Sequence, residues 1–316
     1  MKDYLVVNPE TNEAKYIDSD GVVQSEGRFV PKEVDEKAQR QLEGYRQAKQ
    51  KEDAINRGKG LEWIGCFRDS IKEVASELKP IPCGVLITIL VKMQLGKDGL
   101  LINGGRPMNV GDIGKHIKKS RTQTSEYLSK FVKLGILEEL PDNEDTREKN
   151  YRVNPNYHLM GKFPKSTEEN RFVKLFKNTL KEMIENLKLS ELGFIYKALS
   201  ICHHNTFKLV HNPTARYNPT AKEGSVEASS NTDLELFNRK ELASYMKVNT
   251  KTIDNIVSSL SKKGFIMSNT TSGVTSYRLH PHIIYLSGPL GDEYIQSVCN
   301  EFDIHKKEAL RRSKKA

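Results

Sequence analysis

The sequence predicts a mainly helical fold with small β-hairpins, an α+β arrangement in which two similar units follow one another along the chain. The first observation is an internal repeat, since the stretch from Met108 to Pro155 returns between Leu236 and Pro281. The second is that each copy contains two apolar stripes at helical spacing with a polar turn between them. The third is that each copy closes with two strand-like segments. An internal repeat has to be settled before other features of a chain are interpreted.

The two copies align at an offset of 129 positions over most of their length. Residues 133–136, Lys-Leu-Gly-Ile, fall on residues 262–265, Lys-Lys-Gly-Phe. The closing segments, residues 151–155 and 277–281, align at an offset of 126, so the first copy is three residues longer between its glycine and its tyrosine.

Each copy predicts two helices joined by a tight turn. In the first copy the apolar stripes lie around Ile113 and around Leu128, and the hydroxyl of Ser120 or Thr122 can cap the second helix. Gly135 supplies the left-handed residue that commonly follows the last turn of a helix.

A strand pair follows the two helices. In the first copy, residues 136–140 and 151–153 predict strands around the turn-rich residues 141–145. Helix, turn, helix and strand pair is the order of a winged helix-turn-helix, in which the second helix enters the major groove with its first residues at the base edges. The sequence therefore predicts two winged helix-turn-helix domains in tandem.

Polar residues at the start of each second helix are the candidate base readers, because Arg suits guanine and Asn or Gln suits adenine. Lysines around them would contact phosphates, which positions a protein without specifying sequence. A lysine run is also typical of a solvated face, so that alternative stays open for each lysine. The candidate DNA-binding residues are Lys118, Lys119, Ser120, Arg121, Gln123, Thr124, Ser125, Lys130, Asn249, Thr250, Lys251, Thr252, Asn255, Thr271 and Ser272.

The two predicted wings differ in charge. The first carries Asp142, Glu144, Asp145 and Glu148, and phosphates would repel such a hairpin. The second, residues 269–276, is neutral and small. We therefore expect the two copies to be unequal on DNA, with the first wing turned away from the duplex or in contact with a protein.

Composition favours a polyanionic partner. The chain of 316 residues has 50 Lys and Arg against 41 Asp and Glu, a net charge of +9. No run approaches the roughly 18 apolar residues of a membrane span. The N-terminal residues lack a signal-peptide core, so we expect a cytoplasmic protein associated with the nucleoid. If a phage encodes it, we expect it in the cytoplasm of the host cell.

The predicted organisation has four parts. They are an N-terminal β-hairpin and charged helical arm over residues 1–59, a first winged-helix domain over 60–165, a second over 166–288, and a basic C-terminal helix or tail over 289–316. A chain of this length allows each of the two domains to bury its own core.

Within the two domains, residues 61–78 and 172–187 each predict one amphipathic helix. Apolar runs follow and predict a buried first helix in each unit. Gly84 and Gly193, near the starts of those helices, suggest close packing in each copy.

The sequence contains no pattern that requires an enzyme, a cofactor or a metal. Cys66, Cys83, Cys202 and Cys299 are scattered without the close pairs of a structural zinc site, so we expect free thiols. Histidines at 203, 204, 211, 280 and 282 are spaced poorly for the metal pair of a nickase. We expect a noncatalytic protein without metal.

Residues 151–157, which follow residues 133–137, resemble the closing strand of winged-helix proteins encoded by plasmids and phages. These include small plasmid replication initiators and phage regulators of the multiple-antibiotic-resistance repressor type. The resemblance covers residues 81–160 and, more weakly, 190–285. Two winged helices in one chain also resemble theta-type plasmid initiators. The resemblance implies DNA contact through residues 121–134 and 251–263, whereas the acidic first wing departs from the usual basic hairpin.

The leading hypothesis is a sequence-specific double-stranded DNA-binding protein that regulates transcription as a phage or plasmid repressor. One alternative is a plasmid or phage replication initiator that binds origin repeats, which needs the same groove contacts. A further alternative is an adaptor that uses its winged helices to dock proteins. A second copy of the chain, forming a homodimer, is an open alternative as a partner, and no membrane contact is expected.

Overall fold

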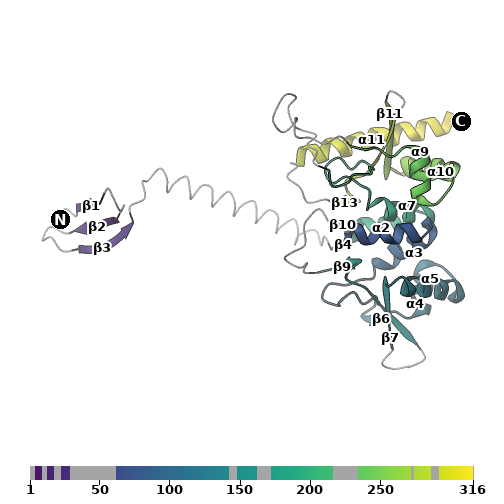
Figure 1. The fold of residues 1–316 in the computed structure, drawn as a ribbon, viewed down its shortest axis with the longest axis horizontal. Coiled ribbons are helices and arrows are strands. Elements are labelled where there is room, and N and C mark those ends of the chain that lie inside the picture. Colours follow the sequence, from purple (N-terminus) through teal and green to yellow (C-terminus); the bar gives the residue numbers. More distant parts are fainter. Residues whose placement is uncertain are drawn as a thin grey trace. The chain divides into compact units, whose positions relative to one another are not determined.

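The computed structural model describes residues 4–8, 13–17, 23–28, 62–141, 148–161, 172–215, 234–271, 274–285 and 292–315. The chain divides into two units, residues 1–61 and residues 62–316. Helices and small antiparallel sheets are mixed in the second unit (Figure 1). Across these ranges, no helix is both long enough and apolar enough to cross a membrane.

The N-terminal unit contains one strand more than the sequence predicted. Strands β1 (Tyr4–Val7), β2 (Glu13–Ile17) and β3 (Val23–Arg28) form an antiparallel sheet in that order. The third strand, with the sequence VQSEGR, was missed because it has few β-branched or aromatic residues. The charged helical arm predicted within residues 32–59 lies outside the described residues.

The second unit contains the two repeats, and nearly every element of one has a counterpart in the other. The first repeat, residues 62–161, contains β4 (Trp63–Phe67), α2 (Arg68–Glu77), α3 (Pro80–Leu90), β5 (Ile102–Asn103), β6 (Arg106–Pro107), α4 (Val110–Ile117), α5 (Arg121–Lys133), β7 (Leu137–Pro141), β8 (Lys149–Val153) and β9 (His158–Leu159). The second repeat, residues 172–285, contains β10 (Phe172–Phe176), α6 (Lys177–Asn186), α7 (Leu189–Ala198), α9 (Arg239–Met246), α10 (Thr250–Lys263), β11 (Ile266–Thr271), β12 (Val274–Leu279) and β13 (Ile284–Tyr285). Helix α11 (Asp292–Lys315) follows, where the sequence predicted a C-terminal helix.

Each repeat opens with a strand and then a helix, so the prediction of a single amphipathic helix over residues 61–78, and another over 172–187, is wrong. Helices α2 and α6 account for only the second part of each segment. Strands β4 and β10 pair with each other, and the rings of Trp63 and Phe172 stack with centroids 6.1 Å apart. Periodicity within a segment could not reveal a backbone partner that lies in the other half of the chain.

The pairing of β4 with β10 is symmetric. Gly65 lies opposite Lys174, which is its counterpart in the other strand. Strand β9 pairs with β4 through Leu159 and Gly65, just as β13 pairs with β10 through Tyr285 and Lys174. The sheet order is therefore β13-β10-β4-β9. An approximate twofold axis passes between Gly65 and Lys174 and relates the two repeats.

Helices α3 and α7 meet in the same symmetric way, between the pair α4–α5 and the pair α9–α10 (Figure 1). A Cβ added to Gly84 would lie 1.8 Å from the carbonyl oxygen of Leu189, and one added to Gly193 would lie 1.7 Å from that of Pro80. The two glycines therefore permit close packing between the repeats, not within each repeat as predicted. Because both helices share this contact, the buried apolar residues form one continuous cluster, and the expectation of two separate cores is wrong.

Two buried cations also cross between the repeats at matched positions. Arg68, the first residue of α2, donates to the carbonyl of Cys202 at 2.7 Å. Lys177, the first residue of α6, donates to the carbonyl of Met93 at 2.7 Å and pairs with Glu62 at 2.7 Å. Each cation donates to a carbonyl just beyond the end of α3 or α7 in the other repeat, where the carbonyl has no hydrogen-bond partner within the helix.

Candidate nucleic-acid interface

The turn between the paired helices has the same backbone in both repeats. Lys118 ends α4 with a φ of 55°, and Lys247 ends α9 with a φ of 56°. This left-handed conformation is uncommon for residues other than glycine. Its presence at two aligned positions shows that the two turns share one geometry. In each case the next helix starts behind a polar cap, Ser120 for α5 and Asn249 for α10.

The leading end of α5 is exposed, as the sequence predicts. The hydroxyl of Ser120 accepts a hydrogen bond from the backbone nitrogen of Gln123 at 3.3 Å, which identifies Ser120 as the cap. The side chains of Arg121, Gln123 and Ser125 lie beyond it and are exposed, that of Arg121 to 72%. These three side chains are therefore available to contact a ligand.

Thr124 does not belong with the predicted base readers. It is fully buried, and its hydroxyl donates to the carbonyl of Ser120 at 2.8 Å. A Cβ added to Gly114 would lie 3.0 Å from that hydroxyl oxygen, so Thr124 packs α5 against α4. The alignment of the repeats could have excluded it, because Thr124 falls on Ile253, which is also fully buried.

The leading end of α10 is similarly uncovered. The side-chain oxygen of Asn249 accepts from the backbone nitrogen of Thr252 at 2.8 Å, so Asn249 caps this helix. Lys251 and Asn255 are exposed, whereas Thr250 and Thr252 are half-buried. Among the candidate base readers, the second repeat therefore exposes the cation of Lys251 and the amides of Asn249 and Asn255, beside the exposed carboxylate of Asp254.

The lysines predicted to contact phosphates lie on the surface of the first pair of helices. Lys118 and Lys130 are exposed, and Lys119 is half-buried. They flank the leading end of α5 and its last turn, so their charges are accessible to an anionic ligand.

The first predicted wing, strands β7 and β8, contacts the start of α5 through an acidic residue. Glu148 lies 3.3 Å from the guanidinium of Arg121, in an ion pair that crosses from the wing to the start of α5. Two further pairs link β7 to β8, Lys149 with Glu139 and Arg152 with Glu138. Residues 142–147, at the tip, lie outside the described residues. The acidic character predicted for this wing therefore acts, in part, on a candidate base reader.

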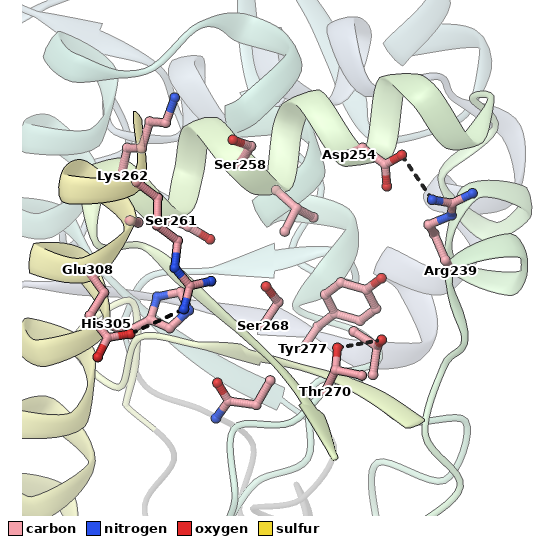
Figure 2. A pocket seen from close by; sticks show the side chains of 15 residues that line it. Arg239, Asp254, Ser258, Ser261, Lys262, Ser268, Thr270, Tyr277, His305 and Glu308 are labelled. Atoms are coloured by element: carbon pink, nitrogen blue, oxygen red, sulfur yellow. Dashed lines mark hydrogen bonds and ion pairs between the residues drawn. The ribbon is translucent and has the colours of Figure 1, made fainter. Parts of the chain in front are cut away.

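A polar groove lies between α10, the second wing and α11 (Figure 2). Its volume is about 940 Å³. The cations along it are Arg239, Lys262 and Arg312; Arg239 pairs with Asp254 at 3.2 Å and Arg312 pairs with Glu308 at 3.7 Å. Hydroxyl and amide groups of Ser258, Ser261, Ser268, Asn269, Thr270, Thr275 and Tyr277 supply most of the remaining lining. Such a surface can hold a phosphodiester strand.

None of the candidate DNA-binding residues named from the sequence is among the described residues that line this groove. Thr271 ends β11, where it pairs with Val274, and Ser272 lies outside the described residues. Arg239 and Tyr277 were missed as lining residues. The available signal for Arg239 was its place beside the cap residue Asn238, and a lone arginine at a helix start predicts little on its own.

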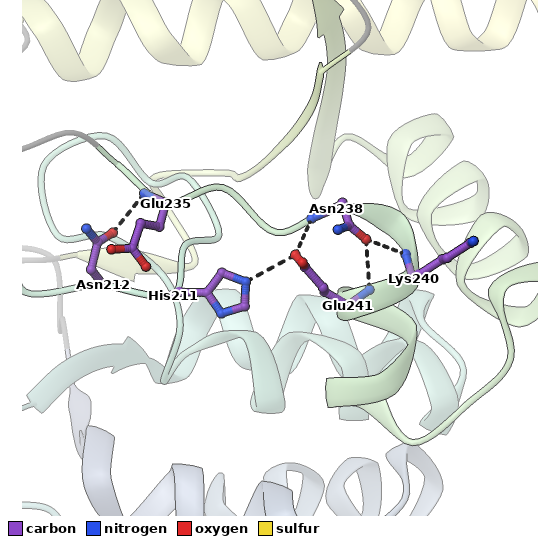
Figure 3. Close-up of polar contacts among 6 residues, drawn as sticks. All are labelled: His211, Asn212, Glu235, Asn238, Lys240 and Glu241. Carbon is purple, nitrogen blue, oxygen red and sulfur yellow. Dashed lines mark hydrogen bonds and ion pairs between the residues drawn. The ribbon is translucent and has the colours of Figure 1, made fainter.

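A network of polar contacts fixes the start of α9 (Figure 3). Asn238 accepts from the backbone nitrogens of Lys240 and Glu241, at 2.9 and 3.0 Å, while the Glu241 carboxylate accepts from the backbone nitrogen of Asn238 and pairs with His211 at 3.2 Å. The backbone hydrogen bond from Asn238 is the main reason that the pKa of Glu241 is lowered. This reciprocal cap sets where α9 begins and hence where α10 lies.

The histidines near Cys202 serve structural contacts. His203 is buried, with its two ring nitrogens 3.0 Å from the hydroxyl of Thr206 and 3.0 Å from the carbonyl of Ala215. Burial lowers the pKa of His203 to about 4, which keeps the ring neutral at physiological pH.

Comparison of the chain with known proteins gave no match to a protein family, a curated protein or a solved structure.

Proposed function

We propose that this protein binds double-stranded DNA sequence-specifically through two winged helices and regulates transcription. The observation that carries the proposal is the pair of matching turns at Lys118 and Lys247, each of which presents the polar, uncovered start of a helix. A helix offered in this way fits the major groove, which is about 12 Å wide. The net charge of +9 supports a polyanionic ligand.

The symmetry of the second unit supports a particular kind of site. Helices α5 and α10 belong to repeats that an approximate twofold axis relates, as the register of Gly65 opposite Lys174 requires. Two reading helices related in this way meet inverted half-sites when they enter one duplex. A directly repeated site would need helices related by a translation. The geometry therefore argues against two halves that read direct repeats of one half-site, whereas an initiator that places one whole chain on each origin repeat fits it as well as a regulator does. The location of the sites, at a promoter or in repeated units at an origin, distinguishes the two.

The two half-sites should differ in sequence. The exposed candidate base readers at the start of α5 are Arg121, Gln123 and Ser125, whereas those of α10 are Lys251 and Asn255. Different donors and acceptors select different bases. The protein should therefore prefer an imperfect inverted repeat, with each half assigned to one helix.

The test is selection of binding sites from a pool of random duplexes, followed by footprinting. Arg121→Ala should relax preference at one base position of one half-site, Lys251→Ala should do so in the other, and each should cost about 1–3 kcal/mol. Lys181→Ala, an exposed lysine on α6 outside both helix pairs, should change neither half-site. Failure to bind duplex DNA, or binding that ignores salt, would reject the proposal and favour a protein-docking adaptor.

A further inference from the structure

Three metal-ligating side chains lie together where α11 meets the second repeat. His280 and His282 come from the turn that follows β12, and Cys299 comes from α11. One possible ligand atom from each lies within 4.8 Å of the others. The sulfur of Cys299 is 3.7 Å from Nε2 of His282.

These distances suit a small thiophilic cation. Tetrahedral zinc binds sulfur at about 2.3 Å and imidazole nitrogen at about 2.0–2.1 Å, so neighbouring ligand atoms stand roughly 3.5 Å apart. One thiolate and two imidazoles match the preferences of zinc, not those of magnesium or calcium, which take oxygen ligands. Small rotations of the side chains would bring the three atoms onto one ion.

The turn at Pro281 arranges the two histidines before any ion arrives. The backbone nitrogen of Ile283 donates to the carbonyl of His280 at 3.0 Å, and the two imidazole centroids lie 4.8 Å apart. Nδ1 of His280 accepts from the backbone nitrogen of His282 at 3.1 Å, and coordination through this atom would exchange that hydrogen bond for a metal bond. The His280 ring also meets Phe302 of α11 edge-on at 4.8 Å, which fixes its orientation.

The three side chains leave the fourth position of a tetrahedral shell to a water or another small ligand. Asp303 follows Cys299 by four residues on the same face of α11, but its carboxylate is not among the groups that lie within 4.8 Å of one another.

A metal ion at this site would strengthen the attachment of α11, which buries few apolar side chains. Among the described apolar residues of the helix, Val298 and Phe302 are buried, whereas Ile304 is 60% exposed and Leu310 is 41% exposed. A short apolar anchor therefore holds a long helix that lies along the second repeat (Figure 1). An ion bound at Cys299 would cross-link this helix to the turn after β12 through coordination bonds.

We propose that His280, His282 and Cys299 bind a zinc-class metal ion, which clamps α11 to the second repeat. The site is separate from the leading ends of α5 and α10, and the proposal does not depend on DNA binding.

The test uses the full chain, reduced and stripped of metal, with Zn²⁺ and Co²⁺ as probes. Competition with a chromophoric chelator should show one tightly bound Zn²⁺ per chain. Co²⁺ should produce a thiolate charge-transfer band with the intense visible bands of a tetrahedral ion. Hydrogen exchange of backbone amides near residue 299 should slow when Zn²⁺ is added.

Cys299→Ser and His282→Ala should each weaken Zn²⁺ binding by more than the roughly 10- to 100-fold that loss of a supporting residue costs. Cys299→Ser should also abolish the charge-transfer band. Both side chains lie at or near the surface, and circular dichroism would confirm folding. His305→Gln, a histidine of α11 outside the cluster, is the matched control and should bind Zn²⁺ normally. The proposal is overturned if the wild type binds no Zn²⁺ or if binding survives both ligand substitutions.

Discussion

The two repeats share one backbone plan but hold it with different side-chain chemistry. At His116 the ring nitrogen lies 3.1 Å from the carbonyl of Thr88, and at the aligned position the hydroxyl of Tyr245 donates to the carbonyl of Lys197 at 3.4 Å. The residue that carries the carbonyl also changes, from Thr88 in the first repeat to Lys197 in the second, and both side chains are buried. At this pair of positions the linked backbone carbonyl is retained in both repeats, while the side chain that contacts it changes from histidine to tyrosine.

The largest effects on stability are expected at the crossing of α3 and α7, where the two repeats should respond alike. Gly193→Ala and Gly84→Ala should each destabilise the fold by about 4 kcal/mol or more, because either Cβ would overlap a backbone carbonyl that cannot move independently. Urea unfolding measures the loss. The effects should be similar at the two positions, since they are equivalent.

Gly111→Ala is the control for the glycine substitutions. In this helix only the side-chain oxygen of Asn109 would lie near a new Cβ, at 3.3 Å. Stability should stay within about 1 kcal/mol of the wild type. A mild effect of Gly193→Ala would contradict the close contact between the repeats.

Lys197 and its counterpart Thr88 should differ in how their contributions to the free energy of unfolding depend on pH. Burial lowers the pKa of Lys197 to about 8, although its amine donates to the carbonyls of Ala75 and Leu78 at 2.8 and 2.9 Å. Between pH 8 and about 10.4 the unfolded chain binds more protons at this residue than the folded chain, so its contribution to stability rises with pH.

The measurement is the free energy of unfolding of the wild type and of Lys197→Met across that window. The wild type should gain stability relative to the variant by on the order of 3 kcal/mol. Titration of other groups is common to both proteins and cancels. The wild type should show no such gain relative to Thr88→Val, because neither threonine nor valine titrates.

An ion pair distinguishes how α5 and α10 are held. Lys263 of α10 pairs with the buried Glu191 of α7 at 2.7 Å, whereas the position aligned with Lys263 is Leu134. Lys263→Met should cost about 1–3 kcal/mol at neutral pH, because a buried carboxylate loses a hydrogen-bond donor. Leu134→Met should cost less than about 1.5 kcal/mol.

Acid should reduce the cost of Lys263→Met. Burial alone would raise the pKa of Glu191, but hydrogen bonds from Lys263, Ser259 and the backbone of Lys188 lower it overall. The stabilisation is therefore present above the ordinary pKa of about 4.3 and is lost as pH falls through the lower folded value. A cost that stayed constant below pH 4 would contradict this role.

The smallest expected effect concerns the acidic first wing. Glu148→Gln should strengthen binding to DNA by about 0.2–1 kcal/mol, because the exposed Arg121 no longer shares its charge with a half-buried carboxylate. Electrophoretic mobility shifts at low and high salt would measure the change. Glu138→Gln, which removes the same charge from the pair with Arg152, controls for net charge and should have less effect.

The helix pairs could be predicted from the sequence because their information is local. The apolar spacing, the caps Ser120 and Asn249 and the closing Gly135 all lie within the elements that they define. Exposure of Arg121 and Lys251 followed from the same pattern.

Features that join distant parts of the chain could not be predicted. Strand β4 depends on a partner strand in the other repeat, and the need for glycine at position 84 comes from the carbonyl of Leu189, which leaves no room for a Cβ. The groove beside α11 likewise combines separate segments. Thr124 is the exception, because its alignment with Ile253 marked it as a core position in advance.

The pairing of Gly65 with Lys174 joins, within one polypeptide, strands that a symmetric homodimer would draw from two subunits. Because the halves are linked, their association does not weaken on dilution. Identical subunits must also accept every substitution twice. Here each half can change alone, so one molecule can carry two different sets of exposed polar side chains, at the starts of α5 and α10, on a common backbone.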